Sequence, residues 1–126
     1  MNTSYTSYAP VISVRNLTKS YGQHTVLRDI SLDIYPGESV AIMGPSGSGK
    51  STIARLIASL WDVDEGGIFL GGTDIRKISF EDYNRRVAYV SQDNYLFNTS
   101  IRENIRYGKL DATDEECIAA ARLAGA

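Results

Sequence analysis

The sequence predicts an α/β fold with three parts: a core built around a glycine-rich loop, an antiparallel β layer and the start of a helical subdomain. Three observations support this prediction. The glycine-rich stretch Gly44–Thr52 stands between an apolar run and a helical apolar stripe. Segments at residues 11–35 and 67–75 alternate apolar and polar side chains or form short apolar runs, as strands do. Helix-capping pairs follow in the last third of the chain.

The glycine-rich stretch has the pattern G-x-x-x-x-G-K-[ST], a phosphate-binding loop. Its glycines permit positive φ, so that successive N–H groups form a nest for an anion at a helix N-terminus. We expect the Lys50 ammonium to bind the β- and γ-phosphates and the Ser51 hydroxyl to bind Mg²⁺. The motif predicts a P-loop NTPase core that binds a nucleoside triphosphate. A dinucleotide fingerprint fits less well, because G-x-G-x-x-G needs glycine where Thr52 stands. The expected ligand-binding residues of the loop are Gly44, Ser46, Gly47, Ser48, Gly49, Lys50, Ser51 and Thr52.

The strands expected around this loop are short. Residues 12–17, 25–27 and 30–35 indicate strands of the antiparallel layer, and 68–70 indicates another. The mostly apolar run 39–43 favours a strand buried on both faces, and 87–90 indicates another short apolar strand.

The expected helices have recognisable starts. An apolar stripe at Ile53, Leu56, Ile57 and Leu60 predicts a helix after the loop. Ser79 is a candidate N-cap, and the pairs Ser100 with Glu103 and Thr113 with Glu116 predict capping boxes.

Composition narrows the class of protein. At 126 residues the chain is one domain's worth or less. Thirteen basic and fifteen acidic side chains give a net charge of −2, so nothing favours a nucleic-acid surface or a polybasic membrane patch. The single cysteine, Cys117, forms no internal disulfide and fits a reducing compartment.

No apolar run has the length of a transmembrane helix, and residues 1–10 are expected to be a leader or linker. We expect a soluble chain that reaches a membrane only through a partner.

Three further stretches accompany the loop. Tyr21, in the stretch 19–22, precedes it at the position of an A-loop aromatic. Gln92 ends the apolar run 87–90, as a Q-loop glutamine does, and residues 96–105 look like the segment that follows the Q-loop in exporters. From about Val11 onward the chain resembles the ATP-binding domain of ABC transporters, exporter branch.

The resemblance implies roles for these residues. Tyr21 would stack on adenine, for which a flat π-face is suited. Gln92 would contact both Mg²⁺ and the attacking water, which makes Lys50 and Gln92 the candidate catalytic residues and Ser51 and Gln92 the candidate metal ligands. From residues alone, Tyr21 could equally be a surface tyrosine, and a solvated loop glutamine is the favoured interpretation of Gln92. The resemblance reverses the interpretation of Gln92. The implied cofactors are ATP and Mg²⁺.

The implied partners are a second ATP-binding domain and a transmembrane domain, fused or separate, at the cytoplasmic face of a membrane. Residues 98–105 would face the transmembrane domain, with Phe97 and Ile101 as apolar anchors. The alternative is that these two side chains pack internally.

The sequence also departs from the family pattern. It contains no Leu-Ser-Gly-Gly-Gln signature, no apolar strand ending in Asp-Glu and no later switch histidine. We therefore expect residues 11–126 to be the N-terminal part of a truncated ABC-type ATP-binding domain, with weak nucleotide binding and little hydrolysis of its own. Residues 40–43 would then face an unpaired sheet edge, which favours self-association or rearrangement. The alternatives are a nucleotide-binding module without catalysis and, ranked lower, a soluble ABC ATPase outside transport.

Overall fold

The computed structural model describes residues 9–126, so residues 1–8 of the expected leader lie outside the described part. The chain divides into two compact units, Met1–Tyr89 and Val90–Ala126. The first carries the sheet, the glycine-rich loop and the first two α-helices. The second carries two short helices and the segment that leads to them.

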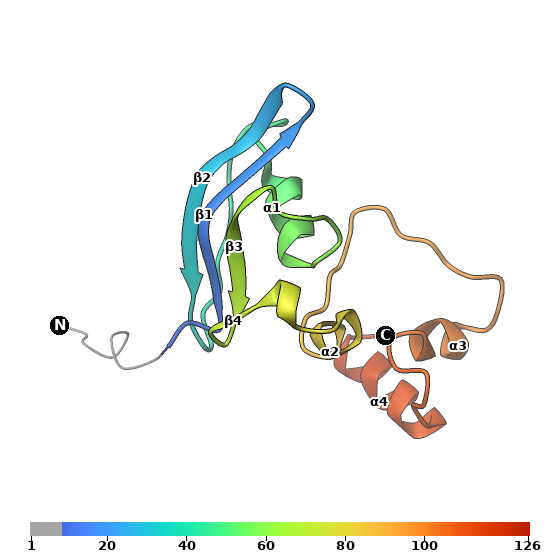
Figure 1. Ribbon diagram of the computed structural model, residues 1–126. Coiled ribbons are helices and arrows are strands. Elements are labelled where there is room, and N and C mark those ends of the chain that lie inside the picture. The colour runs from blue at the N-terminus through green and yellow to red at the C-terminus, as the bar shows by residue number, and fades with distance from the viewer. Residues whose placement is uncertain (1–8) are drawn as a thin grey trace. The chain divides into compact units, whose positions relative to one another are not determined.

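The first unit is built on a four-stranded antiparallel sheet with the order β2-β1-β3-β4 (Figure 1). This confirms the antiparallel layer expected from residues 11–35 and 67–75. The two strands expected at 25–27 and 30–35 form one long strand, which passes through a left-handed residue at Asp29 (φ 51°). The strands are β1 Ile12–Tyr21, β2 His24–Ile34, β3 Glu65–Leu70 and β4 Thr73–Asp74.

The irregularity in β2 is matched by one in β1. Asn16 also has a positive φ of 48°, and its side-chain amide donates to the Asp29 carboxylate at 2.8 Å. Such left-handed residues change the strand register locally, and Asn and Asp tolerate the conformation. On the other side of β1, Gly66 lies so close that an added Cβ would sit 2.3 Å from the Arg15 carbonyl oxygen. Only glycine fits there.

The core of the first unit lies between this sheet and helix α1, Lys50–Ile57, which covers one face of the sheet (Figure 1). The expected helical stripe is confirmed for Ile53 and Leu56, which are buried, whereas Leu60 lies beyond the helix and is exposed. The 3-10 helix η2, Ile75–Lys77, and helix α2, Phe80–Asn84, complete this unit, and Ser79 caps α2 as expected by accepting from the Asp82 N–H. The buried cluster consists of Val14, Leu17, Leu27, Ile53, Leu56, Ile68, Ile75 and Tyr83.

The apolar runs 39–43 and 87–90 are not strands, and this expectation was wrong. A strand needs backbone partners along its edges, and no segment among residues 9–126 pairs with either run. Most of the apolar side chains in the two runs are exposed, with Met43 at 90% and Val90 at 88% of full accessibility, whereas Val87 is half-buried against the core. The expected self-association of such an apolar edge stays a prediction.

The second unit contains helix α3, Ile101–Arg106, and helix α4, Asp114–Leu123. Ser100 caps α3 by accepting from the Glu103 N–H, and Thr113 forms a full capping box with Glu116. Arg106 joins the two helices through an ion pair with Asp114, and this pair holds the pKa of the Asp114 carboxyl below its usual value. Within residues 9–126, no helix is long and apolar enough to cross a membrane.

Tyr83 generates a stability prediction. Its ring is 1% exposed, and its hydroxyl donates to the Ile57 carbonyl at the end of α1, while burial raises the pKa of the phenol. Tyr83→Phe leaves that carbonyl without its partner, so we expect the free energy of unfolding to fall by about 1–2 kcal/mol in urea denaturation. Tyr89→Phe, at an exposed tyrosine, is the control and should change it by less than about 0.5 kcal/mol. Equal stability of Tyr83→Phe and the parent chain would contradict the role of this hydrogen bond.

Candidate functional site

The glycine-rich loop has the backbone that an anion nest requires. Gly47 and Gly49 have φ of 80° and 94°, in the left-handed region where other residues are strained. The Ser48 N–H donates to the Pro45 carbonyl at 3.2 Å, which closes the turn. An added Cβ at Gly44 would lie 2.7 Å from Ser48 Oγ, so a side chain there would require the serine hydroxyl to move. The left-handed glycines at 47 and 49, with Ser48 between them, give the loop the alternating backbone conformations that anion nests use.

Gly49 joins the loop to the sheet. An added Cβ at Gly49 would lie 2.7 Å from Leu27 Cδ2 and 3.3 Å from the Val26 carbonyl oxygen, so the loop exit packs directly on β2. Gly49 is buried, and it is also the residue immediately before α1. The phosphate loop thus has a fixed place relative to the β1–β2 hairpin.

Lys50 lies within the loop rather than pointing into solvent. Its ammonium donates to the Gly44 carbonyl at 2.5 Å and the Pro45 carbonyl at 2.8 Å, and it lies 3.4 Å from Ser48 Oγ. Atoms from both ends of the loop therefore surround one positive charge. An anion bound in the nest would be close to this charge.

The start of α1 adds donors to the same place. Gly49 supplies no side-chain cap, and no acidic residue stands in the first turn. The first N–H groups of a helix have no intrahelical acceptor, so they and the helix dipole favour an anion. Ser51 is exposed in this first turn, whereas Thr52 is buried at 8% accessibility and acts in packing. We expect Thr52 to contribute through its backbone.

Among the hydroxyl groups of this loop, that of Ser51 is the candidate ligand for Mg²⁺. Mg²⁺ at phosphate sites takes one or two protein oxygens and fills its other positions with phosphate oxygens and water. Among residues 9–126, no cluster of three or more His, Cys, Asp or Glu side chains is suited to hold a metal. The donor set therefore fits an ion that arrives with a phosphate and does not fit a site built from protein ligands alone.

Tyr21 lies at the end of β1, in the unit that carries the loop. Its ring is 45% exposed, so one part is available to a ligand and another part contacts the protein. Lys19, two residues earlier, pairs with Leu27, the residue on which Gly49 packs. Tyr21 therefore lies two strand residues, about 7 Å, beyond the Lys19–Leu27 pair.

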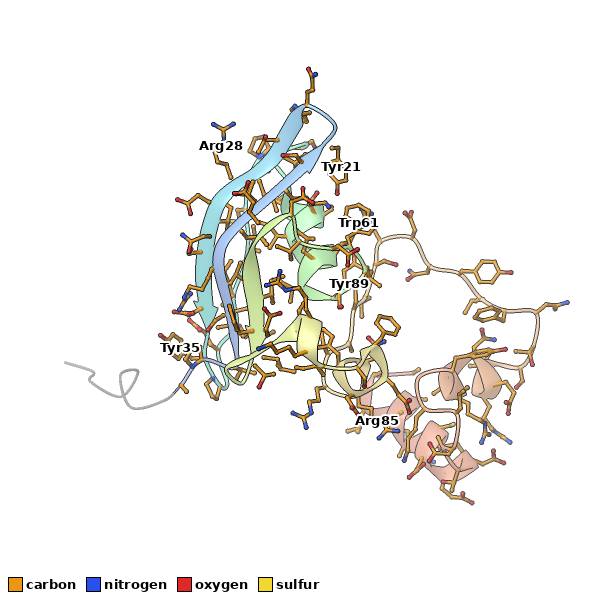
Figure 2. All side chains as sticks on the ribbon, viewed as in Figure 1. Tyr21, Arg28, Tyr35, Trp61, Arg85 and Tyr89 are labelled. Carbon is orange, nitrogen blue, oxygen red and sulfur yellow. The ribbon has the colours of Figure 1, made fainter. Side chains whose placement is uncertain are left out.

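Two residues that contact the end of β1, Trp61 and Asp64, were missed by the sequence reasoning. Trp61 contacts the tyrosine edge-to-face, with ring centroids 5.7 Å apart and planes at 79° (Figure 2). The Asp64 carboxylate accepts from the Ser20 N–H at 2.8 Å and from Lys19 Nζ at 3.0 Å. Trp61 is the one tryptophan of the chain, which could have drawn attention to it. No sequence spacing, however, predicts a contact with a tyrosine forty positions earlier.

Gln92 belongs to the second unit, and it is exposed in an irregular segment. The structure therefore brings together Tyr21, Lys50 and Ser51 in one unit and describes Gln92 in another. Its neighbour Ser91 donates through its hydroxyl to the Asp93 carbonyl, which forms a local turn.

The segment after Gln92 carries the two expected anchors. The ring of Phe97 contacts the ring of Tyr107, with centroids 4.4 Å apart, and its backbone N–H donates to the Asn104 side chain at 2.9 Å. Phe97 is nevertheless 49% exposed, and Ile101 is 81% exposed. Neither side chain is buried, so both stay candidate anchors.

Comparison with known proteins agrees with these features. Residues 27–125 match the family model described as "ABC transporter". The chain is 51% identical over 106 residues to "Iron-sulfur clusters transporter ATM1, mitochondrial" of Debaryomyces hansenii, covering 83% of this chain and 15% of that protein. It is 41% identical over 124 residues to "ATP-dependent lipid A-core flippase" of Desulfotalea psychrophila, covering 98% of this chain and 22% of that protein.

A solved structure gives the same result for the fold. The "Structure of a bacterial Atm1-family ABC exporter with ATP bound" matches with a TM-score of 0.82 and 38% identity, over 92% of this chain and 21% of that chain. The chain thus spans about a fifth or less of each of these proteins. The family match over most of its length, the glycine-rich loop and the fold agree: the chain belongs to the ABC transporter family.

Proposed function

We propose that the chain binds ATP with Mg²⁺ and is the N-terminal part of the ATP-binding domain of an exporter. In the whole protein, ATP binding and hydrolysis would be coupled to export of a substrate across a membrane. The printed names of the relatives refer to iron–sulfur clusters and to lipid A-core, so the cargo differs between them.

One observation carries the proposal: the loop that surrounds Lys50 packs, through Gly49, on the hairpin that ends in the exposed ring of Tyr21. A phosphate-binding nest and an aromatic face on one rigid scaffold suit a ligand with a phosphate chain at one end and a flat base at the other. Base–aromatic stacking contributes about 1–3 kcal/mol. Tyr21 would stack on adenine, and residues 44–52 would hold the phosphates.

The chain's own residues then have distinct tasks. Lys50 places positive charge at the β- and γ-phosphates, and the N–H groups at the start of α1 stabilise the same oxygens. The Ser51 hydroxyl and the Gln92 side chain would hold the metal, and Gln92 would orient the attacking water. Mg²⁺, when bound, neutralises charge on the phosphate oxygens.

The proposed partners are a transmembrane domain, fused or separate, and a second ATP-binding domain. Ile101 and the residues of 98–105 would contact the transmembrane domain, because an 81% exposed isoleucine on a capped helix offers an apolar anchor. The domain would then act at the cytoplasmic face of the membrane.

A nucleotide-binding module without catalysis is the second candidate for the 126 residues taken alone. Hydrolysis needs a group that orients water and a second acid that holds the metal. The sequence has no Asp-Glu pair after an apolar strand and no Leu-Ser-Gly-Gly-Gln stretch. We propose that these 126 residues hold ATP weakly and hydrolyse little of it.

Lys50→Ala tests the phosphate site. The substitution removes the charge at the centre of the loop, and charge-assisted hydrogen bonds contribute about 1.5–3 kcal/mol, so we expect the Kd for Mg·ATP to rise at least about tenfold. Isothermal titration calorimetry on the full chain measures this. Lys77→Ala, at an exposed lysine of the same unit, is the matched control and should bind like the parent. Equal Kd values for both variants would refute the site.

Tyr21→Leu tests the base site. We expect the Kd for Mg·ATP to rise about tenfold while the Kd for Mg·tripolyphosphate, which lacks a base, stays within about twofold. Tyr21→Phe keeps the π-face and should bind both ligands like the parent. A parallel loss for both ligands would mean that Tyr21 acts on the loop instead of on the base.

The rate of phosphate release tests the proposal that these 126 residues hydrolyse little ATP. We expect the 126-residue chain at saturating Mg·ATP to release phosphate no faster than its Lys50→Ala variant. Turnover at the level of intact ATP-binding domains, abolished by Lys50→Ala, would show that these residues alone complete the catalytic site.

A further inference from the structure

Tyr21 is only partly buried, so the contacts that hold it in place come from a few neighbouring residues. The residue ends a strand beside a two-residue turn, and its ring is 45% exposed. A side chain in such a place loses rotamer freedom when a ligand stacks on it, and this loss weakens binding unless the ring is already held. The surrounding contacts therefore bear on affinity.

The backbone before Tyr21 is tied to the segment that follows α1. The Asp64 carboxylate accepts from the Ser20 N–H at 2.8 Å and from Lys19 Nζ at 3.0 Å, and Lys19 Nζ also donates to the Asp62 carbonyl at 2.9 Å. The Ser20 amide, followed by Lys19, holds the pKa of the Asp64 carboxyl below its usual value. The two residues that precede Tyr21 are thus fixed by one carboxylate.

The ring of Tyr21 is held from the side by Trp61. The two rings meet edge-to-face at 5.7 Å, and the Arg55 guanidinium lies 4.9 Å from the centroid of the Trp61 ring. Arg55 is in α1, the helix that begins at Lys50. Figure 2 shows Trp61 beside Tyr21, on the side of the sheet where α1 packs.

These contacts form one continuous connection between the two halves of the nucleotide site. The helix that starts at the phosphate loop carries Arg55, the segment after it carries Trp61 and Asp64, and these two contact the end of β1. We propose that Trp61 and Asp64 are positioning residues that hold the Tyr21 ring ready to stack on the base of a bound nucleotide. The inference rests on the proposed function, in which Tyr21 stacks on adenine.

A purely structural role predicts something different. If the Asp64 and Trp61 contacts only stabilised the fold, their removal would lower the binding affinity of every ligand of the loop equally. If they position Tyr21, their removal weakens binding of ligands that carry a base and spares ligands that do not. The comparison of ATP with tripolyphosphate separates the two roles.

The experiment measures Kd for Mg·ATP and Mg·tripolyphosphate by calorimetry on the full chain. The test variants are Asp64→Ala and Trp61→Leu. Asp62→Ala is the matched control for the first, because Lys19 contacts only the backbone carbonyl of Asp62. Trp61→Phe is the control for the second, because it keeps an aromatic edge toward Tyr21. Each test variant is also made in the Tyr21→Leu background, which gives a double-mutant cycle.

We expect Asp64→Ala and Trp61→Leu to raise the Kd for Mg·ATP by about threefold to tenfold and to leave the Kd for Mg·tripolyphosphate within about twofold. Both controls should bind like the parent, and in the Tyr21→Leu background the test variants should have no further effect. Since Trp61 is the single tryptophan, its emission gives a second readout: ATP should change it more than tripolyphosphate, and Asp64→Ala should reduce this difference.

Three results would overturn the inference. Equal losses of affinity for Mg·ATP and Mg·tripolyphosphate would mean that Asp64 and Trp61 only stabilise the fold. Unchanged ATP affinity in both test variants, with Tyr21→Leu still weakened, would refute positioning and leave the proposed function standing. If Tyr21→Leu itself binds ATP like the parent, base stacking fails, and the inference fails with it.

Discussion

The packing of Gly49 on β2 is the constraint on which the rest of the site depends. A side chain at this position would lie 2.7 Å from Leu27 Cδ2, and the backbone there has a φ of 94°, so glycine is required by both space and conformation. The contact places the phosphate loop against the sheet, and α1 then continues from it with Ile53 and Leu56 buried in the core. Loop, helix and hairpin therefore form one scaffold.

We propose that two distant parts of the sequence serve one ligand on this scaffold. The loop gains its positive character from backbone N–H groups, the start of α1 and the Lys50 ammonium, and no acidic side chain in the first turn opposes it. The hairpin carries Tyr21, and residues that follow α1 contact the Tyr21 ring and the backbone of the preceding Ser20. The loop and these contacts are therefore both attached to the same helix, α1.

The second unit is held together differently. Its helices are short, few of its apolar side chains are buried, and ion pairs such as Arg106 with Asp114 join them. The Asn104 side chain fixes the turn before α3 through the backbone of Phe97, which leaves Ile101 exposed on the first turn. The exposed Ile101 is the residue of this unit that we propose as an anchor for a transmembrane domain.

The sequence by itself determined what depends on neighbours in the chain. The loop motif, the caps at Ser79, Ser100 and Thr113, and the alternating strands of the antiparallel layer follow from contacts within a few residues, and each is present. Only the tertiary structure decided the rest. Residues 39–43 are apolar enough for a buried strand, but a strand needs a partner, and none among the described residues pairs with them. The contacts of Trp61 and Asp64 with the end of β1 bridge about forty residues, and no local pattern encodes them, because they arise only once α1 and β1 are packed together.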